Sequence, residues 1–286
     1  MKRAFINSLI VGAVMFGVAG VCLADFTYAN FSSTSGLQLV GTAATSGTSV
    51  RLVRDGFSSQ IGAAWRTDKQ TIVNGFDTTF SFSITNQAGT TFADGLTFVV
   101  QNSASGILAA GSDGGGIGYA SNEYSSTGIA NSLAVEIDLW DNGPSFPDPN
   151  SKPLSESNLD LYPHISVQTR GTAVNSPSHL YSLGFVQDTG QYNFKNGSPH
   201  TIHLTYEPGT LSIFVDGGAT PAIVAPVNFG SLLNLDNGAA FVGFTASAGG
   251  GSCSDDLRSW SFTSTPEPAT ALMLVLGGLM AARRRR

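Results

Sequence analysis

Two acidic side chains, Glu136 and Asp138, lie two residues apart in a segment whose other residues are mostly apolar. Residues two apart in a β-strand point to the same face, so these acids would stand about 7 Å apart at their Cα atoms. Such carboxylates repel each other, and one would take up a proton unless a divalent cation bound both. The pair therefore predicts a metal site; the alternative is a solvated strand edge that leads into a polar loop.

The residues after this strand offer further metal ligands. Trp140 can supply its backbone carbonyl, Asn142 an amide oxygen, Asp148 a carboxylate and His164 an imidazole nitrogen. Oxygen ligands suit Ca²⁺, and a site that adds a histidine suits Mn²⁺ or a similar transition metal.

The order of these residues resembles the legume-type (L-type) lectins. Their metal-binding strand has the form Val-Glu-x-Asp, with an aromatic residue and an asparagine after it, and an Asp-Pro and a Pro-His pair follow. The chain matches this pattern with Val135 to Asn142, Asp148-Pro149 and Pro163-His164-Ile165. The resemblance implies a transition-metal site made by Glu136, Asp138, Asp148 and His164. It also implies a Ca²⁺ site made by Asp138, the Trp140 carbonyl, Asn142 and Asp148.

One departure from the lectin pattern concerns the distance to the histidine. An insert, residues 150–162, separates Asp148 from His164, where the family usually has a few residues. The insert bears on the transition-metal site, which uses His164, more than on the Ca²⁺ site.

The Ala93-Asp94-Gly95 motif at the start of a predicted strand would by itself indicate only a turn. It also resembles the Ala-Asp-Gly motif of L-type lectins. There, the aspartate follows a cis peptide bond and accepts hydrogen bonds from two sugar hydroxyls. The resemblance therefore implies that Asp94 is the main sugar ligand.

A glycine-rich stretch, Gly114 to Tyr119, lacks the lysine and the following helix of a phosphate-binding loop. A flexible turn is its simplest interpretation. It resembles the lectin glycine loop, whose backbone N–H approaches a sugar oxygen, and this implies a contact from Gly115 or Gly116. The Asn142 amide would then also contact the sugar, and the Trp140 ring would stack on the pyranose.

The composition predicts a single all-β domain. The chain is 42% hydrophobic and only 12% charged, with 34 glycines and 12 prolines, which favours short strands and turns. His200 to Val215 predicts a hairpin, and Phe241 to Phe262 resembles the closing strands of L-type lectins. The resemblance implies a concanavalin-like jelly-roll β-sandwich of antiparallel sheets over residues 25–264. It leaves residues 168–193 unassigned.

Both ends of the chain are predicted to be targeting signals. Residues 1–24 have the basic start, apolar run and small-residue cleavage site of a secretory signal peptide. A membrane anchor is less favoured because the apolar run is shorter than the ~20 residues of a span. Acylation at Cys22 is less favoured because Val21 is bulky. Cleavage would leave Cys253 as the only cysteine, so no internal disulfide is expected.

Residues 265–286 resemble a PEP-CTERM sorting signal. Pro266-Glu267-Pro268 is followed by an apolar run that would form a transmembrane helix, and then by four arginines. The resemblance implies processing by an exosortase, membrane contact only through this segment before cleavage, and a Gram-negative bacterial source. It places the protein at the cell surface, in the outer membrane or in the extracellular matrix. The alternative is a plain tail anchor.

The net charge limits the partners. Of the 14 basic residues, eight lie between Asp25 and Pro268, against all 20 acidic residues, so this region has a net charge of −12. An acidic chain without basic clusters argues against nucleic acid or anionic lipid as a partner, and is compatible with neutral sugars.

Three function classes fit these observations. The first, which we predict, is a secreted, calcium-dependent carbohydrate-binding protein without enzymatic activity. The second is a laminarinase-like glycoside hydrolase, whose Glu-x-Asp strand ends in a second glutamate. Here, Trp140 and Asp141 stand in that place, and a shorter acid would misplace the catalytic pair. The third is a matrix or adhesion protein that kept the fold without the sugar site.

Overall fold

The computed structural model describes residues 25–122, 125–140 and 163–266. The predicted signal peptide, Asn142, Asp148 and nearly all of the predicted sorting signal lie outside these ranges. Within the described ranges, no helix combines the length and apolar character needed to cross a bilayer.

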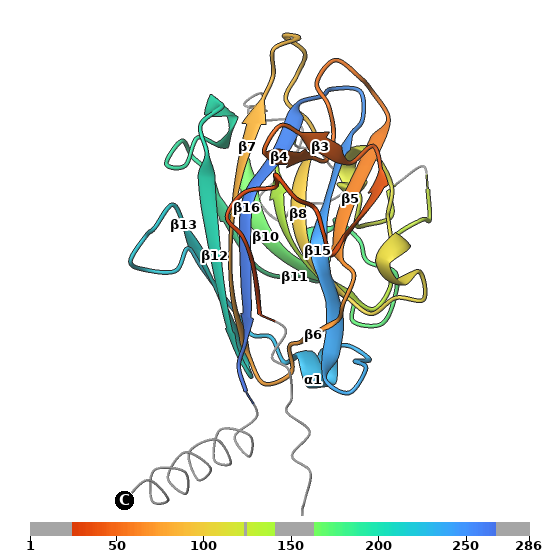
Figure 1. The fold of residues 1–286 in the computed structure, drawn as a ribbon, viewed down its shortest axis with the longest axis vertical. Helices are drawn as coiled ribbons and strands as arrows, with labels where there is room; N and C mark the ends of the chain where they lie inside the picture. The colour runs from red at the N-terminus through yellow and green to blue at the C-terminus, as the bar shows by residue number, and fades with distance from the viewer. Residues whose placement is uncertain (1–24, 123–124, 141–162, 267–286) are drawn as a thin grey trace, which may run out of the picture.

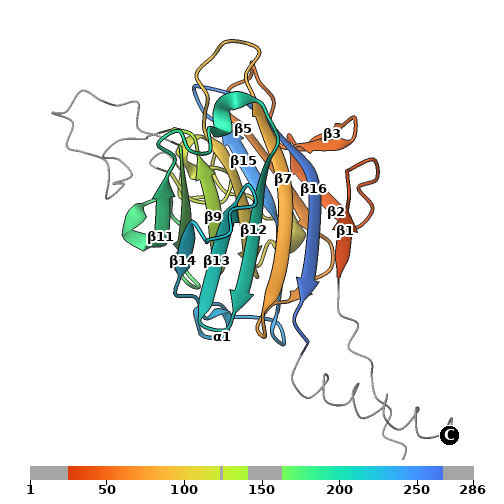
Figure 2. The same cartoon turned by 90° about the vertical axis from the view of Figure 1, so that its left-hand side faces the viewer.

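Two antiparallel sheets of eight strands each face one another, as Figures 1 and 2 show. In the first sheet the order is β14-β13-β12-β7-β16-β4-β3, with β1 also paired to β16. Its strands are β1 (Phe26–Tyr28), β3 (Ala44–Ser46), β4 (Ser49–Arg51), β7 (Phe76–Thr85), β12 (His200–Glu207), β13 (Thr210–Val215), β14 (Ile223–Ala225) and β16 (Ser254–Ser264).

In the second sheet the order is β11-β10-β9-β8-β15-β5-β2, with β6 also paired to β15. Its strands are β2 (Leu37–Gly41), β5 (Gln60–Arg66), β6 (Gln70–Thr71), β8 (Gly95–Gln101), β9 (Ser132–Asp138), β10 (His164–Thr169), β11 (Ser182–Gln187) and β15 (Ala239–Ala248). The described helices are short: α1 (Phe229–Leu232) and the 3₁₀ turns η1 (Gly106–Leu108), η2 (Gly114–Gly116), η4 (His179–Tyr181) and η5 (Phe194–Asn196). The predicted all-β sandwich is confirmed.

The main core lies between the sheets and is rich in aromatic rings. The Phe80 ring of β7 meets the Phe244 ring of β15 at 4.9 Å, and Phe244 meets Trp260 of β16 at 4.7 Å between centroids. All three side chains are buried. Burying each such side chain contributes about 1.5–3 kcal/mol, so these contacts hold the two sheets together.

A long segment, residues 102–122 and 125–131, covers the outer face of the second sheet. Trp65 and Ala134 from the strands form a second apolar cluster there with Ile117 and Tyr119 from the segment. The indole N–H of Trp65 donates to the Ala109 carbonyl at 2.9 Å, which ties the segment to β5. Since Glu136 lies two residues beyond Ala134 on β9, its side chain is on this covered face.

Candidate functional site

The two acids of β9 are buried. Glu136 is 1% exposed and Asp138 is 7% exposed. A solvated strand edge, the alternative that the sequence left open, is therefore wrong for these residues. Buried carboxylates are costly unless they are paired, hydrogen-bonded or bound to a metal, so the contacts of each acid decide what this part of the molecule can do.

Three hydrogen bonds hold the Glu136 carboxylate. The Tyr119 hydroxyl, from the covering segment, donates to Oε2 at 2.6 Å. Ser166 Oγ and Gln168 Nε2, on the neighbouring strand β10, donate to Oε1 at 2.5 Å and 3.1 Å. Ser166 pairs with Glu136 in the β9–β10 register, which explains this contact. These donors fix the orientation of the carboxylate.

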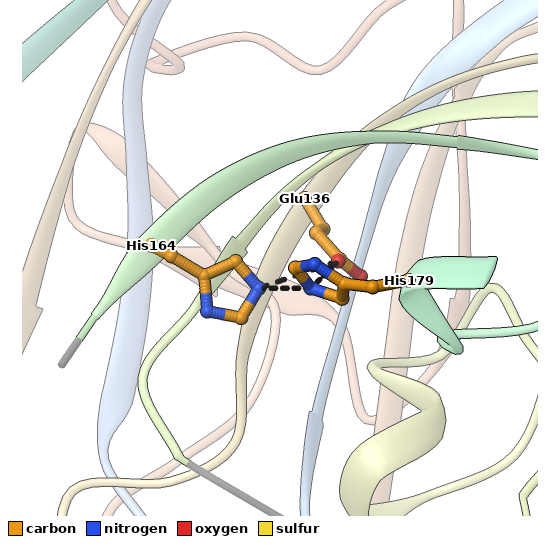
Figure 3. A group of neighbouring side chains, drawn as sticks. All are labelled: Glu136, His164 and His179. Atoms are coloured by element: carbon orange, nitrogen blue, oxygen red, sulfur yellow. Dashed lines mark hydrogen bonds and ion pairs between the residues drawn. The ribbon is translucent and has the colours of Figure 1, made fainter. Parts of the chain in front are cut away.

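Two histidines approach the same carboxylate oxygen, as Figure 3 shows. His164 Nε2 lies 3.5 Å and His179 Nε2 lies 3.9 Å from Glu136 Oε1, and the two nitrogens are 2.9 Å apart. Burial alone would raise the pKa of Glu136. The hydrogen bond and charge of His164, with the charge of His179, outweigh burial and lower that pKa below its usual value.

These three side chains fit a transition metal. One ligand atom from each of Glu136, His164 and His179 can be chosen so that all lie within 4.8 Å of one another. A carboxylate with two imidazoles is a donor set suited to zinc and other first-row metals. Two of the residues, Glu136 and His164, belong to the predicted metal site. The third, His179, was not identified from the sequence.

Asp138 has a different environment. Burial raises its pKa to about 8, and the negative charges of Glu136 and Asp94 add to this effect against the influence of His164. Its Oδ1 accepts a hydrogen bond from the Trp140 N–H at 2.7 Å. A carboxyl group that would hold a proton at neutral pH, next to other acids, is a group that a divalent cation would bind in place of the proton.

Asp94 lies beside this cluster at the start of β8. The peptide bond between Ala93 and Asp94 is cis, as the lectin resemblance implies. The next residue, Gly95, pairs with Asp138, and the Asp94 carbonyl accepts from the Leu139 N–H at 2.8 Å. The predicted sugar ligand is thus attached by its backbone to the strand that carries the metal-binding acids.

The Asp94 side chain is 3% exposed and accepts a hydrogen bond at Oδ2 from the Gly249 N–H at 2.5 Å. Burial raises its pKa to about 7, although the Gly249 hydrogen bond opposes this effect. Gly249 lies in the loop between β15 and β16. This loop and β8 therefore meet at the predicted sugar ligand.

The glycine-rich turn lies close to the same place. A Cβ atom on Gly249 would come within 2.9 Å of the Gly114 Cα and 3.1 Å of Asp94 Oδ2, so only glycine fits there without displacement. Ser247 Oγ donates to the Gly114 carbonyl at 2.7 Å. Gly115 and Gly116, the predicted sugar contacts, are buried in η2. Gly114, the first glycine of this turn, is the one that lies against Gly249.

The remaining predicted residues are placed only in part. Trp140 follows β9 and is 43% exposed, so its ring is accessible for a stacking contact. Asn142 and Asp148 lie outside the described residues, and their roles as ligands stay predictions.

The pKa shifts of Asp138 and Asp94 predict how stability depends on pH. Both values are raised from 3.8, to about 8 and about 7, so the folded state keeps protons that the unfolded chain releases. This stabilisation is complete below about pH 4 and is lost as the pH rises to about 8. Calcium would replace these protons. We therefore expect Ca²⁺ to raise the melting temperature by several °C more at pH 8 than at about pH 5.5.

Thermal unfolding in EDTA and in Ca²⁺ at both pH values measures this difference. A calcium effect that is equal at the two pH values, or larger at the lower one, would contradict it.

Comparison with known proteins decides the family. A family model of the legume lectin domain matches residues 23–274. The chain belongs to the legume lectin family. A lectin of Leucomphalos mildbraedii is 27% identical over 198 residues, which are 68% of this chain and 70% of that lectin.

Two solved structures show the same fold. The lectin from Bauhinia forficata in complex with GalNAc superposes with a TM-score of 0.64 and 22% identity, covering 84% of this chain and 96% of that one. The exoplasmic/lumenal domain of VIP36, in its form bound to Ca²⁺ and Man3GlcNAc, gives a TM-score of 0.59 and 14% identity, covering 84% and 89%. These neighbours confirm the legume lectin jelly roll.

Membership of the legume lectin family also settles the broad function. The protein is a carbohydrate-binding lectin and not an enzyme, because this family and its lectin relatives bind carbohydrate without catalysis. The hydrolase alternative is thereby set aside. The family binds metals, and the cluster around Glu136 offers a site for one.

Proposed function

We propose that this chain is an exported lectin that binds sugar only with Ca²⁺ in place. The observation that carries the proposal is the position of Asp94. It is buried, its backbone is tied to the end of β9, and Gly95 pairs with Asp138. A cation held by Asp138 would neutralise the acids around Asp94 and keep its carboxylate ionised, and an ionised carboxylate is a strong acceptor for sugar hydroxyls.

The cations would be divided between two adjacent sites. Calcium would be held by Asp138, the Trp140 carbonyl, Asn142 and Asp148. Glu136 and His164 would hold the transition metal together with Asp138 and Asp148. The VIP36 domain has the same fold and was solved with Ca²⁺ bound, which supports calcium as a ligand of this chain.

The sugar would lie over Asp94. Its hydroxyls would donate hydrogen bonds to the Asp94 carboxylate. A backbone N–H of the glycine turn, at Gly115 or Gly116, and the Asn142 amide would donate to its oxygen atoms. The accessible ring of Trp140 would stack on the apolar face of the sugar. The sugar complexes of the Bauhinia and VIP36 proteins, with GalNAc and with Man3GlcNAc, support a glycan as the ligand class.

Export and sorting are part of the same proposal. The signal peptide over residues 1–24 would send the chain through the secretory route. The segment over residues 265–286 would hold it in the membrane until an exosortase cleaves it. The lectin would then act at the cell surface, in the outer membrane or in the extracellular matrix of a Gram-negative bacterium.

A glycan array read in Ca²⁺ and in EDTA tests the proposal. We expect bound glycans in Ca²⁺, loss of signal by at least about tenfold in EDTA, and recovery when Ca²⁺ is restored, because removal of the cation leaves the acids around Asp94 to compete for protons. Signals that survive EDTA would contradict the calcium requirement. An array that stays blank in Ca²⁺ would favour a matrix protein that kept only the fold.

A further inference from the structure

His179 lies in the part of the chain, residues 168–193, that no sequence pattern assigned. The structure places it at the first position of the 3₁₀ turn η4, which leads into the edge strand β11. It is 7% exposed, and its ring packs against those of His164 and Phe185, with centroids at 4.7 Å and 5.6 Å. The fold therefore holds this imidazole beside Glu136.

We propose that His179 is a further protein ligand of the transition-metal site, next to Glu136 and His164, and that this second imidazole makes the site prefer Zn²⁺ over Mn²⁺. The inference rests on the metal site of the proposed function and adds a residue to it. The lectin resemblance implies a single histidine at that site, so His179 gives this chain a nitrogen ligand from outside the family pattern.

The distances between the three ligand atoms carry the inference. Two ligands bound to one zinc ion at about 2.1 Å each would be separated by about 3.0–3.4 Å. The observed separations are 2.9 Å between the two Nε2 atoms, and 3.5 Å and 3.9 Å from these atoms to Glu136 Oε1. An ion between them requires the shortest separation to widen by about 0.1 Å and the longest, from His179 Nε2 to Glu136 Oε1, to shorten by about 0.5 Å.

The direction of the side chains supports the same conclusion. The two imidazoles and the carboxylate come from different elements, yet all three groups converge on one point (Figure 3). Hydrogen bonds from Tyr119, Ser166 and Gln168 already hold the carboxylate in this orientation. Groups held in place behind a ligand are a common property of metal sites, because they fix its direction before the ion arrives.

The donor set decides the choice of metal. With His179 the site offers two imidazole nitrogens next to the Glu136 carboxylate. Imidazole nitrogens suit Zn²⁺, whereas Mn²⁺ prefers carboxylate, carbonyl and water oxygens. Affinity of a given site also rises from Mn²⁺ to Zn²⁺ across the first-row metals. Each imidazole that replaces an oxygen increases this preference.

Titration of the purified, metal-stripped protein with Zn²⁺ and with Mn²⁺, in saturating Ca²⁺, tests the proposal. We expect His179→Ala to weaken Zn²⁺ binding by about a hundredfold and Mn²⁺ binding by less than about threefold. His179→Gln, which keeps most of the volume, is the second variant. His203→Ala is the matched control, because His203 pairs with Asp77 on the other sheet and should not affect either metal.

A measurement on the unaltered protein makes the test independent of any folding defect. Cu²⁺ bound at this site should show two coupled imidazole nitrogens by electron paramagnetic resonance. A single nitrogen, or Zn²⁺ binding that is unchanged in both His179 variants, overturns the proposal. If His164→Ala then still abolishes metal binding, the proposed lectin site stands without His179. If the unaltered protein failed to bind sugar in the presence of Ca²⁺, that result would instead count against the proposed function.

Discussion

Replacing Asp94 with asparagine is expected to weaken sugar binding by at least about a hundredfold while leaving the fold intact. The proposed role of this carboxylate is to accept hydrogen bonds from sugar hydroxyls. A hydrogen bond to a charged group contributes about 1.5–3 kcal/mol, so the loss of one or two such bonds accounts for a factor of this size. Asparagine has the same shape but replaces one acceptor oxygen with an NH₂ donor, and its remaining oxygen can still accept from the Gly249 N–H.

Calorimetric titration with a glycan identified on the array measures the effect. Asp68→Asn is the matched control, since the Asp68 side chain is 73% exposed and pairs with Arg66. The control should bind sugar as the unaltered protein does. If the Asp94 variant folds and keeps its affinity within about threefold, which is under 1 kcal/mol, Asp94 is not the sugar ligand.

Replacing Glu136 with glutamine should remove the transition-metal site and preserve the folded structure. The amide oxygen can still accept from Ser166 and Gln168, and the amide NH₂ can donate to the Tyr119 hydroxyl, which would reverse the direction of that one bond. What is lost is the negative charge that binds the ion. We expect the affinity for Zn²⁺ or Mn²⁺ to fall by at least about a hundredfold.

The consequence for stability follows from linkage. A hundredfold weaker affinity removes about 2.7 kcal/mol of metal-dependent stabilisation at high metal concentration, which corresponds to roughly 5–10 °C in melting temperature. Thermal unfolding with and without metal measures it. Glu207→Gln, at the exposed last position of β12, is the same chemical change away from the site. If metal raised the melting temperature of the Glu136 variant as much as that of this control, Glu136 would not bind the ion.

Much of the fold could be predicted from local patterns. The hairpin of β12 and β13 begins and ends where the sequence indicated, because alternating side chains flank the short Pro208-Gly209 turn. Glu136 and Asp138 were correctly placed on a single strand face for the same reason. The sequence left their burial open, because burial depends on the segment over residues 102–122 and 125–131, and nothing in the local pattern of β9 specifies that cover.

Contacts between distant parts of the chain could not be derived from spacing. Asp94 lies next to Asp138 because β8 and β9 pair in a register that sets Gly95 opposite Asp138. This register cannot be read from the sequence, and only the family resemblance predicted that the two residues belong to one site. Tyr119 was missed for a similar reason, since it reaches Glu136 from the covering segment and its neighbours along the chain are glycines and small residues.

His179 illustrates a further limit. It stands in a Ser- and Pro-rich stretch without strand or helix periodicity, so its position depends on how the chain returns to β11. The only sequence signal that could have indicated His179 was the small number of histidines. The chain has four histidines, and each one in a protein with few basic residues is a candidate ligand once a metal site is suspected.

The central claim is that a cation beside the buried acids of β9 makes sugar binding possible. The most direct measurement is calorimetric titration of one glycan into the same sample in three states: loaded with Ca²⁺, stripped by EDTA and dialysis, and reloaded with Ca²⁺. We expect binding in the first state, no measurable heat in the second and full recovery in the third. Equal affinity in the stripped protein, with its metal content verified as nil by mass spectrometry, would contradict it.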